Sequence, residues 1–228
     1  MRMSRRFFSF LLAGWLMSSC SVIPGFGPSA QSEFEQGLAL YNQGRYQQAA
    51  ERFQKATELD PNFGRAYLYL GRAYIGLRSW SLALTALRRA YQLVPDETKS
   101  EAVSILIDAL FGYGRSALAS GDFISAIDAF REILGLRTNS AEARSDLVRA
   151  LVGHGGALLA KGSVTQAISA YSEAVKLAPN HFDALFGLAK AFFRSGDYLK
   201  ALQNAESAMR LDAGNRELQS LLQELRRR

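Results

Sequence analysis

Small residues and prolines recur at a fixed interval of 34 positions in this chain. The matched pairs are Gly37 and Gly71, Ala49 and Ala83, and Pro61 and Pro95. A fixed period of this size is typical of proteins built from stacked repeats. Each repeat is too short to bury a core alone, so neighbouring units must cover its apolar faces. The period therefore predicts an elongated stack instead of a globular domain.

The best-formed unit runs from residue 64 to residue 97. It reads Tyr67-x2-Leu70-Gly71-x2-Tyr74, then Ala83-x3-Leu87-x2-Ala90, then Pro95. This order resembles the tetratricopeptide repeat (TPR) family, with Tyr67 in the place of the usual Trp. The resemblance implies an all-α fold, a right-handed superhelical solenoid of helix-turn-helix hairpins.

The array is predicted to hold about five hairpins within residues 32–215, with a capping helix at 216–228. The predicted repeats are 30–63, 64–97, 98–140, 141–181 and 182–215. The strict period fails twice, because nine and seven extra residues precede the third and fourth repeats in Thr98–Leu106 and Ala141–Leu147. Both insertions lack Pro and Gly and continue a helical pattern. We expect the first helices of these two repeats to be about two turns longer than the others.

Small side chains are predicted to sit where two helices cross closely, since a larger one would push the backbones apart. The repeating alanines of the second helices are the test of this account: Ala83, Ala126, Ala167 and Ala201. The first helices of the third and fourth repeats hold more glycine than such crossings need, namely Gly112, Gly114, Gly153, Gly155 and Gly156. This excess is equally compatible with a kink, with close approach of a partner and with a loosely specified helix.

Residues 1–19 resemble a bacterial export signal, with a basic start and an apolar run from Phe7 to Met17. Eleven residues rise roughly 16 Å as a helix, which is far short of a hydrocarbon core of about 30 Å. Met17-Ser18-Ser19-Cys20 resembles a lipobox, which implies that Cys20 receives lipid and that residues 20–31 form a flexible tether. Plain secretion and an uncleaved anchor are the alternatives, and Arg5-Arg6 leaves the twin-arginine export route open. By resemblance, Ser21 favours the periplasmic face of the outer membrane, with a soluble periplasmic protein as the alternative.

The net charge of +6 is concentrated at the two ends of the chain. Removing Arg2, Arg5 and Arg6 and the last three arginines leaves 21 basic and 21 acidic residues. A balanced repeat body gives no support to a nucleic-acid surface. No nucleophile motif or phosphate loop occurs, and His154 and His181 lack partners at metal-ligand spacing. We therefore expect no enzyme activity, no cofactor, no metal and no small-molecule substrate.

In the TPR family the first helix of each hairpin lines the concave side of the superhelix. The resemblance therefore implies a peptide-binding groove here, and helical periodicity indicates which residues of each first helix would line it. Its expected residues are Phe34, Leu38, Tyr41, Arg65, Leu68, Tyr69, Arg72, Phe111, Arg115, Arg149, Phe186, Lys190 and Phe193. Apolar and basic groups alternate in this set, which favours a peptide client with apolar anchors and acidic residues between them. The alternative is that the apolar members pack between hairpins and the basic ones are only solvated.

The predicted function is a protein-protein interaction scaffold anchored by lipid in the bacterial envelope. The resemblance to repeat-bearing outer-membrane lipoproteins points to envelope assembly, such as pilus or secretin biogenesis or insertion of outer-membrane proteins. A regulatory or structural subunit of a cell-wall enzyme complex, binding through its convex face, is the alternative.

Overall fold

The computed structural model describes residues 28–228, and eleven α-helices with no strand make up this part of the chain. The expected export segment, Cys20 and most of the expected tether lie outside the described residues. The helices are α1 (Ala30–Asn42), α2 (Tyr46–Leu59), α3 (Gly64–Gly76), α4 (Trp80–Leu93), α5 (Asp96–Ser120), α6 (Phe123–Leu136), α7 (Ala141–Ala160), α8 (Val164–Leu177), α9 (Phe182–Ser195), α10 (Tyr198–Met209) and α11 (Arg216–Leu225).

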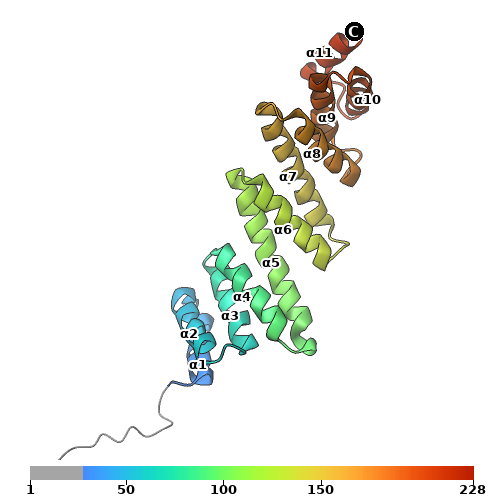
Figure 1. Cartoon of the computed structure of the whole chain (residues 1–228). Coiled ribbons are helices and arrows are strands. Elements are labelled where there is room, and N and C mark those ends of the chain that lie inside the picture. Colours follow the sequence, from blue (N-terminus) through green and yellow to red (C-terminus); the bar gives the residue numbers. More distant parts are fainter. Residues whose placement is uncertain (1–27) are drawn as a thin grey trace, which may run out of the picture.

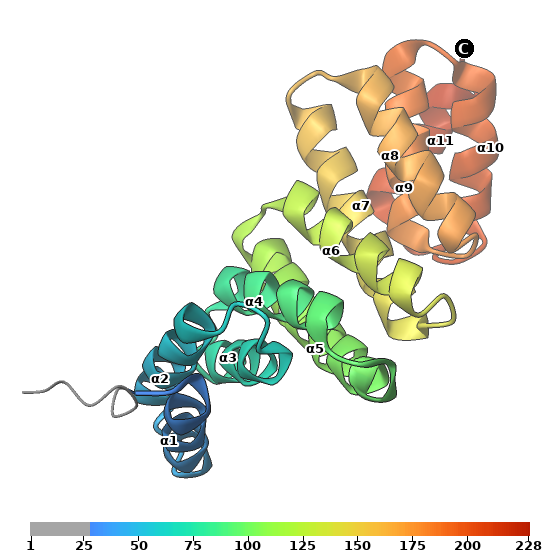
Figure 2. The ribbon, with the colours of Figure 1, turned by 60° about the horizontal axis from the view of Figure 1, so that its bottom comes forward.

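The helices pair in chain order into five antiparallel hairpins, and α11 packs on the last one (Figure 1). Each helix packs mainly against the helices next to it in sequence, with weaker contacts between successive first helices such as α7 and α9. The result is an all-α repeat superhelix whose C-terminus lies at the far end from α1, and Figure 2 shows the change in direction of successive hairpins.

The first helices of the third and fourth hairpins are longer than the others, as predicted from the two insertions. Helix α5 has 25 residues and α7 has 20, compared with 13 in α1 and α3. Helix α5 begins directly after Pro95, which holds the extended backbone of its N-cap. At the start of the array, α1 begins at Ala30 with Ser29 as its cap, inside the range expected for the tether.

Helix α5 is also the one described helix that is long and apolar enough to span a membrane by length and composition alone. Its apolar residues Ala102, Ile107 and Leu110 are buried in the same core cluster as residues of α4, α6 and α7. These apolar side chains are therefore used in packing between hairpins.

Inside each of the first four hairpins, one side chain of the second helix covers a glycine of the first helix 16 residues earlier. A Cβ on these glycines would overlap the covering side chain. The pairs are Gly37 with Phe53, Gly71 with Leu87, Gly114 with Phe130 and Gly155 with Tyr171. The four repeating alanines of the second helices are fully buried, which confirms the prediction made for Ala83, Ala126, Ala167 and Ala201.

A second series of glycines joins one hairpin to the next. The aromatic residue that opens a second helix lies against a glycine on the following first helix: Tyr46 against Gly76, Trp80 against Gly112, and Phe123 against Gly153. The excess glycine in α5 and α7 is therefore explained by packing within the chain. Of the five residues in question, only Gly156 has no close neighbour, with Tyr171 Oη 3.5 Å from the position of a Cβ.

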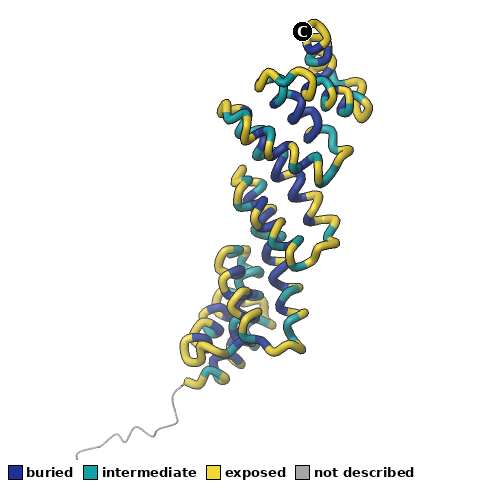
Figure 3. Tube along the Cα trace, turned by 45° about the vertical axis from the view of Figure 1, so that its right-hand side comes forward, coloured by how far each residue is buried: buried dark blue, intermediate teal, exposed yellow. Residues whose placement is uncertain are grey.

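The turns inside the hairpins use a left-handed residue after the first helix. Four turns place glycine there, with φ between 73° and 86°. The second hairpin places Arg78 at the same point, with φ of 55°. In the third and fifth hairpins Asp122 and Asp197 then cap the next helix. Figure 3 shows that every hairpin of the stack contributes buried residues, which alternate along the helices with exposed ones.

Candidate protein-binding face

The residues expected to line a groove lie on the first helices α1, α3, α5, α7 and α9, and we call this surface the first-helix face. Three of them are core residues: Phe34, Leu68 and Phe186 are 1%, 3% and 6% exposed. They are too deep to offer much contact area to a partner, because Phe34 and Leu68 pack against the adjoining hairpin and Phe186 packs with α10 and α11. The half-buried members are Leu38, Tyr41, Tyr69, Arg72, Phe111, Lys190 and Phe193, and the exposed ones are Arg65, Arg115 and Arg149.

Basic side chains on this face lie over aromatic rings. The guanidinium of Arg72 is 4.9 Å from the Tyr69 ring centre, and that of Arg115 is 5.0 Å from Phe111. Lys190 Nζ lies 4.3 Å from the Phe186 ring centre. Arg65 makes the same contact between hairpins, 5.3 Å above Phe34. Attraction between a cation and the ring face fixes each basic head group above an apolar patch.

Three of these basic groups pair with carboxylates on the next first helix or on α11, and we call these pairs the charge ladder. Arg72 of α3 meets Glu101 of α5 at 2.5 Å. Arg115 of α5 meets Glu142 of α7 at 2.5 Å, and Lys190 of α9 meets Glu217 of α11 at 3.2 Å. Each rung links hairpins that are successive in the stack, or the last hairpin to its cap.

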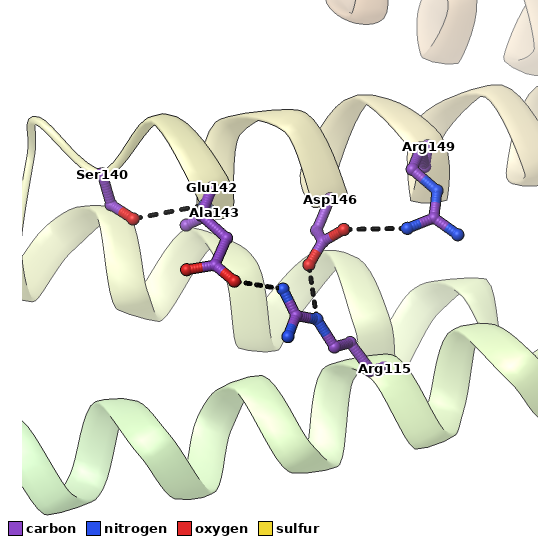
Figure 4. Close-up of polar contacts among 6 residues, drawn as sticks. All are labelled: Arg115, Ser140, Glu142, Ala143, Asp146 and Arg149. Atoms are coloured by element: carbon purple, nitrogen blue, oxygen red, sulfur yellow. Dashed lines mark hydrogen bonds and ion pairs between the residues drawn. The ribbon is translucent and has the colours of Figure 1, made fainter.

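The rung between α5 and α7 is the most extensive (Figure 4). Arg115 Nε also donates to Asp146 Oδ2 at 2.8 Å, and Arg149 donates to Asp146 Oδ1 at 3.0 Å. The Asp146 side chain is 7% exposed, so two guanidinium groups compensate a buried carboxylate. Hydrogen bonds to Glu142 and then Asp146 raise the pKa of Arg115.

The ladder revises the expected chemistry of the face. The sequence predicted a client with apolar anchors and acidic residues between them, which would pair with the basic side chains of the face. Four of the five instead have a carboxylate partner, and among residues 28–228 only Arg65 of this set has none. The residues that sequence reasoning missed are Glu101, Glu142, Asp146 and Glu217. The sequence spacing could have indicated two of them, because Glu142 and Glu217 each follow a predicted basic groove residue by 27 positions.

Three predicted residues meet at one cavity near the C-terminal end of the first-helix face. Phe186, Lys190 and Phe193 line a space of about 330 Å³ together with Leu221 of α11. Leu159 of α7 contributes from the preceding hairpin, where its carbonyl accepts a 2.8 Å hydrogen bond from Arg194. Glu217 and Glu224 stand on the α11 side of the same space. We call this the α9–α11 cavity.

A larger cavity of about 460 Å³ lies between the second helices α6 and α8, with α7 also contributing to its wall. Ile124, which is 62% exposed, His154 and Leu158 line it. Arg131 and Glu173 stand at this cavity and form an ion pair of 2.7 Å. The other histidine, His181, accepts from the N–H of Ala184 and so caps α9. Within the part of the chain that the structure describes, no three His, Cys, Asp or Glu residues group as a metal site.

Stacked helical hairpins with a capped end and an open first-helix face define this chain as a repeat protein of the scaffold class. A sequence model of the tetratricopeptide repeat matches residues 34–98 and 152–216, which together exceed half of the chain. The protein belongs to the tetratricopeptide repeat family. Proteins of this fold are generally non-catalytic scaffolds whose domains bind protein or peptide partners.

One solved structure supports the fold, and others are similar at lower scores. The chain is similar to a TPR repeats protein from Bacteroides fragilis, with a TM-score of 0.59 and 13% identity, over 88% of this chain and 99% of that one. It also matches the TPR domain of P58(IPK), with a TM-score of 0.42 and 18% identity, over 87% of this chain and 55% of that one. YrrB, described as a TPR protein with an unusual peptide-binding site, matches at a TM-score of 0.39 and 18% identity, over 87% and 92% of the two chains. No curated protein sequence matched the chain.

Proposed function

We propose that this protein is a non-catalytic adaptor of the bacterial envelope, anchored at a membrane by lipid on Cys20, that holds a protein or peptide client on its first-helix face. The repeat fold supports the scaffold role. The lipobox-like run Met17–Cys20 supports the anchor, and the envelope pathway we favour is assembly of pili, secretins or outer-membrane proteins. Anchoring would raise the local concentration of the client, so that a modest affinity is sufficient.

The α9–α11 cavity is the observation that carries this proposal. It joins apolar surface from Phe193 and Leu221, above the buried ring of Phe186, with charged groups of both signs at its edge. Such a space suits one apolar side chain of a client, with polar groups left to bind the client backbone. Its volume of about 330 Å³ is at the small end of the roughly 300–1,000 Å³ typical of ligand pockets, which fits an anchor residue and not a whole ligand.

The charge ladder limits which client would bind well. The pairs Arg72–Glu101, Arg115–Glu142 and Lys190–Glu217 present alternating charges along the face. A strongly acidic client would have to compete with carboxylates already in place. We therefore infer a client segment with apolar anchors and little net charge, which refines the acidic client expected from the sequence.

The test is recovery of clients from envelope extracts, and of synthetic segments derived from them, by three variants of the full-length protein. Lys190→Met should reduce recovery at least fivefold, because it removes the cation above Phe186 while keeping an apolar stem. Glu217→Gln is the matched control, because it breaks the same ion pair and leaves Lys190 in place. If both variants lose the client equally, loosening of α11 explains the loss and the binding role of Lys190 is rejected.

The third variant addresses the alternative of a subunit that docks through its second helices. The 460 Å³ cavity between α6 and α8 favours that reading, and Ile124→Ser changes its most exposed apolar residue. If Ile124→Ser loses the client while Lys190→Met binds it fully, the first-helix face is rejected as the binding site. The alternative, a subunit of a cell-wall enzyme complex that binds through its convex face, is then favoured.

The anchor is tested separately by labelling cells with a radioactive fatty acid. The wild-type protein should take up label and fractionate with the outer membrane, and Cys20→Ala should do neither. Uptake of label by Cys20→Ala would reject lipidation at this residue, while an unlabelled but exported wild type would identify a soluble periplasmic protein.

A further inference from the structure

Arg78 stands where the other four hairpins have glycine. The position follows the first helix of each hairpin and has positive φ throughout: 73°, 80°, 79° and 86° at the glycines and 55° at Arg78. The local hydrogen bonds are the same, since Arg78 N–H donates to the Ile75 carbonyl at 2.9 Å and Gly44 N–H donates to the Tyr41 carbonyl at 2.9 Å. Left-handed backbone is unfavourable for a residue with a Cβ. The second hairpin therefore keeps a strained arginine where glycine forms the same turn.

Residues with a strained backbone are common at functional sites, where the side chain has a role that offsets the strain. Arg78 lines a cavity of about 300 Å³ between the α3–α4 turn and the C-terminal end of α5. Trp80, Tyr113 and Asp122 also line it, with the hydroxyl groups of Ser81 and Ser116. No apolar residue larger than alanine, other than these aromatics, contributes to the lining. We call this space the Arg78 cavity.

The aromatic wall is held in place by the packing of α4 on α5. Trp80 covers Gly112, and a Cβ at position 112 would overlap the six-membered ring of the indole. This glycine lets the indole lie directly against the backbone of α5. A flat aromatic surface next to the cavity is thus part of the repeat packing and is present before any ligand arrives.

The polar groups of the cavity remain available. Within residues 28–228, neither the guanidinium of Arg78 nor the hydroxyl of Tyr113 takes part in any of the side-chain hydrogen bonds or ion pairs. Asp122 uses Oδ1 to cap α6 through the N–H of Ser125 at 3.2 Å, which leaves Oδ2 as an acceptor. The cavity therefore offers an arginine that only donates, a carboxylate that only accepts, and hydroxyl groups that do both.

We propose that the Arg78 cavity binds one ring of a saccharide. The hydroxyl groups of a sugar both donate and accept, so they complement Arg78 and Asp122 at once, and the C–H face of the ring fits an indole surface. Arg78 would attract a carboxylate or phosphate but Asp122 would repel it, so the pair of opposite charges suits a neutral polar ligand better than an anion. The site does not depend on the proposed client-binding role, because it lies at the hairpin turns and shares no residue with the α9–α11 cavity.

Tryptophan fluorescence provides the test. The chain has two tryptophans, Trp15 and Trp80, so the full-length Trp15→Phe protein reports on the cavity alone. The probes are triacetylchitotriose and maltotriose, with the peptide acetyl-Glu-Glu-Glu-amide as the anionic comparison. We expect at least one sugar to change the Trp80 emission in a saturable manner below about 10 mM, and the peptide to have no effect.

Arg78→Gly separates binding from folding. Because glycine suits the turn, this variant should fold at least as well as the parent, yet bind the sugar at least tenfold more weakly. Tyr113→Ala should weaken binding about fivefold, while Arg45→Gln, at the turn of the first hairpin, should bind normally. The proposal is overturned if neither sugar changes the emission, if the acidic peptide binds instead, or if Arg78→Gly binds as tightly as the parent.

Discussion

The ring of Phe130 occupies the space that a Cβ on Gly114 would need, with Cε1 and Cζ both 2.9 Å from that position. Phe130 is fully buried, so neighbouring residues enclose its ring on all sides. The two residues are 16 apart in sequence, and the same relationship recurs in three other hairpins. Contact between an aromatic or leucine side chain and a bare backbone thus sets the distance between the two helices.

Gly114→Ala should therefore lower the free energy of unfolding by about 1–2 kcal/mol, because the cost of overpacking exceeds the gain in helix propensity. Gly135→Ala is the matched control, since no atom lies within 4 Å of its added Cβ. That variant should be more stable than wild type by roughly 0.5–1 kcal/mol. Urea unfolding followed by circular dichroism measures both, and equal changes at the two sites would refute the packing account.

Arg78→Gly should raise the free energy of unfolding by about 1 kcal/mol, because it removes a Cβ from a left-handed position. Gly121→Ala, at the equivalent turn with φ of 80°, should lower it by a similar amount. Thermal unfolding of both proteins provides the comparison. A less stable Arg78→Gly protein would mean that the arginine side chain supports the turn by contacts that outweigh its strain.

The rung between Arg115 and Asp146 should contribute more than an exposed ion pair, because the carboxylate is buried. A double-mutant cycle with Arg115→Met and Asp146→Asn should give a coupling of about 1 kcal/mol at low salt. The exposed pair Arg228–Glu224 should show a coupling near zero in the same assay. Equal couplings at both places would mean that the ladder has no stabilising role.

Acid should weaken the helix starts at Asp122 and Asp197. Hydrogen bonds from Ser125 lower the pKa of Asp122, and those from Lys200 lower the pKa of Asp197. Their contribution is present above the unfolded-state pKa of about 3.9 and is lost as pH falls through the lower folded-state pKa. An Asp122→Asn, Asp197→Asn protein keeps cap acceptors that do not titrate, so it should lose less stability than wild type between pH 6 and pH 2.5. If both proteins lose the same stability over this pH range, titration of Asp122 and Asp197 does not contribute to the acid sensitivity.

The helical hairpins could be predicted because their determinants are local. Side-chain size repeats with a fixed period, so the alignment of Ala83 with Ala126, Ala167 and Ala201 gave both the helix pairs and the two long first helices. The role of the glycines in α5 and α7 could not be predicted in the same way. Their partners Trp80 and Phe123 belong to the preceding hairpin, and that contact depends on how successive hairpins are rotated.

The first-helix face was harder to predict than the fold, because its contacts also depend on how successive hairpins are stacked. Helical period placed Phe34, Leu68 and Phe186 on the first helices, but only the stacking of neighbours determines how deeply a position is buried. Ion pairs such as Arg72–Glu101 also depend on that stacking. Sequence reasoning therefore found the residues that alternate along the face and missed the carboxylates that neutralise them.

Helix contacts in this chain join near neighbours only, and no contact links α1 or α2 to the last two hairpins. In a polypeptide held together in this way, disruption of one interface between hairpins leaves the hairpins on either side of it folded. Loss of the terminal hairpin and its cap should leave the remainder folded, with its newly uncovered end prone to associate with other chains.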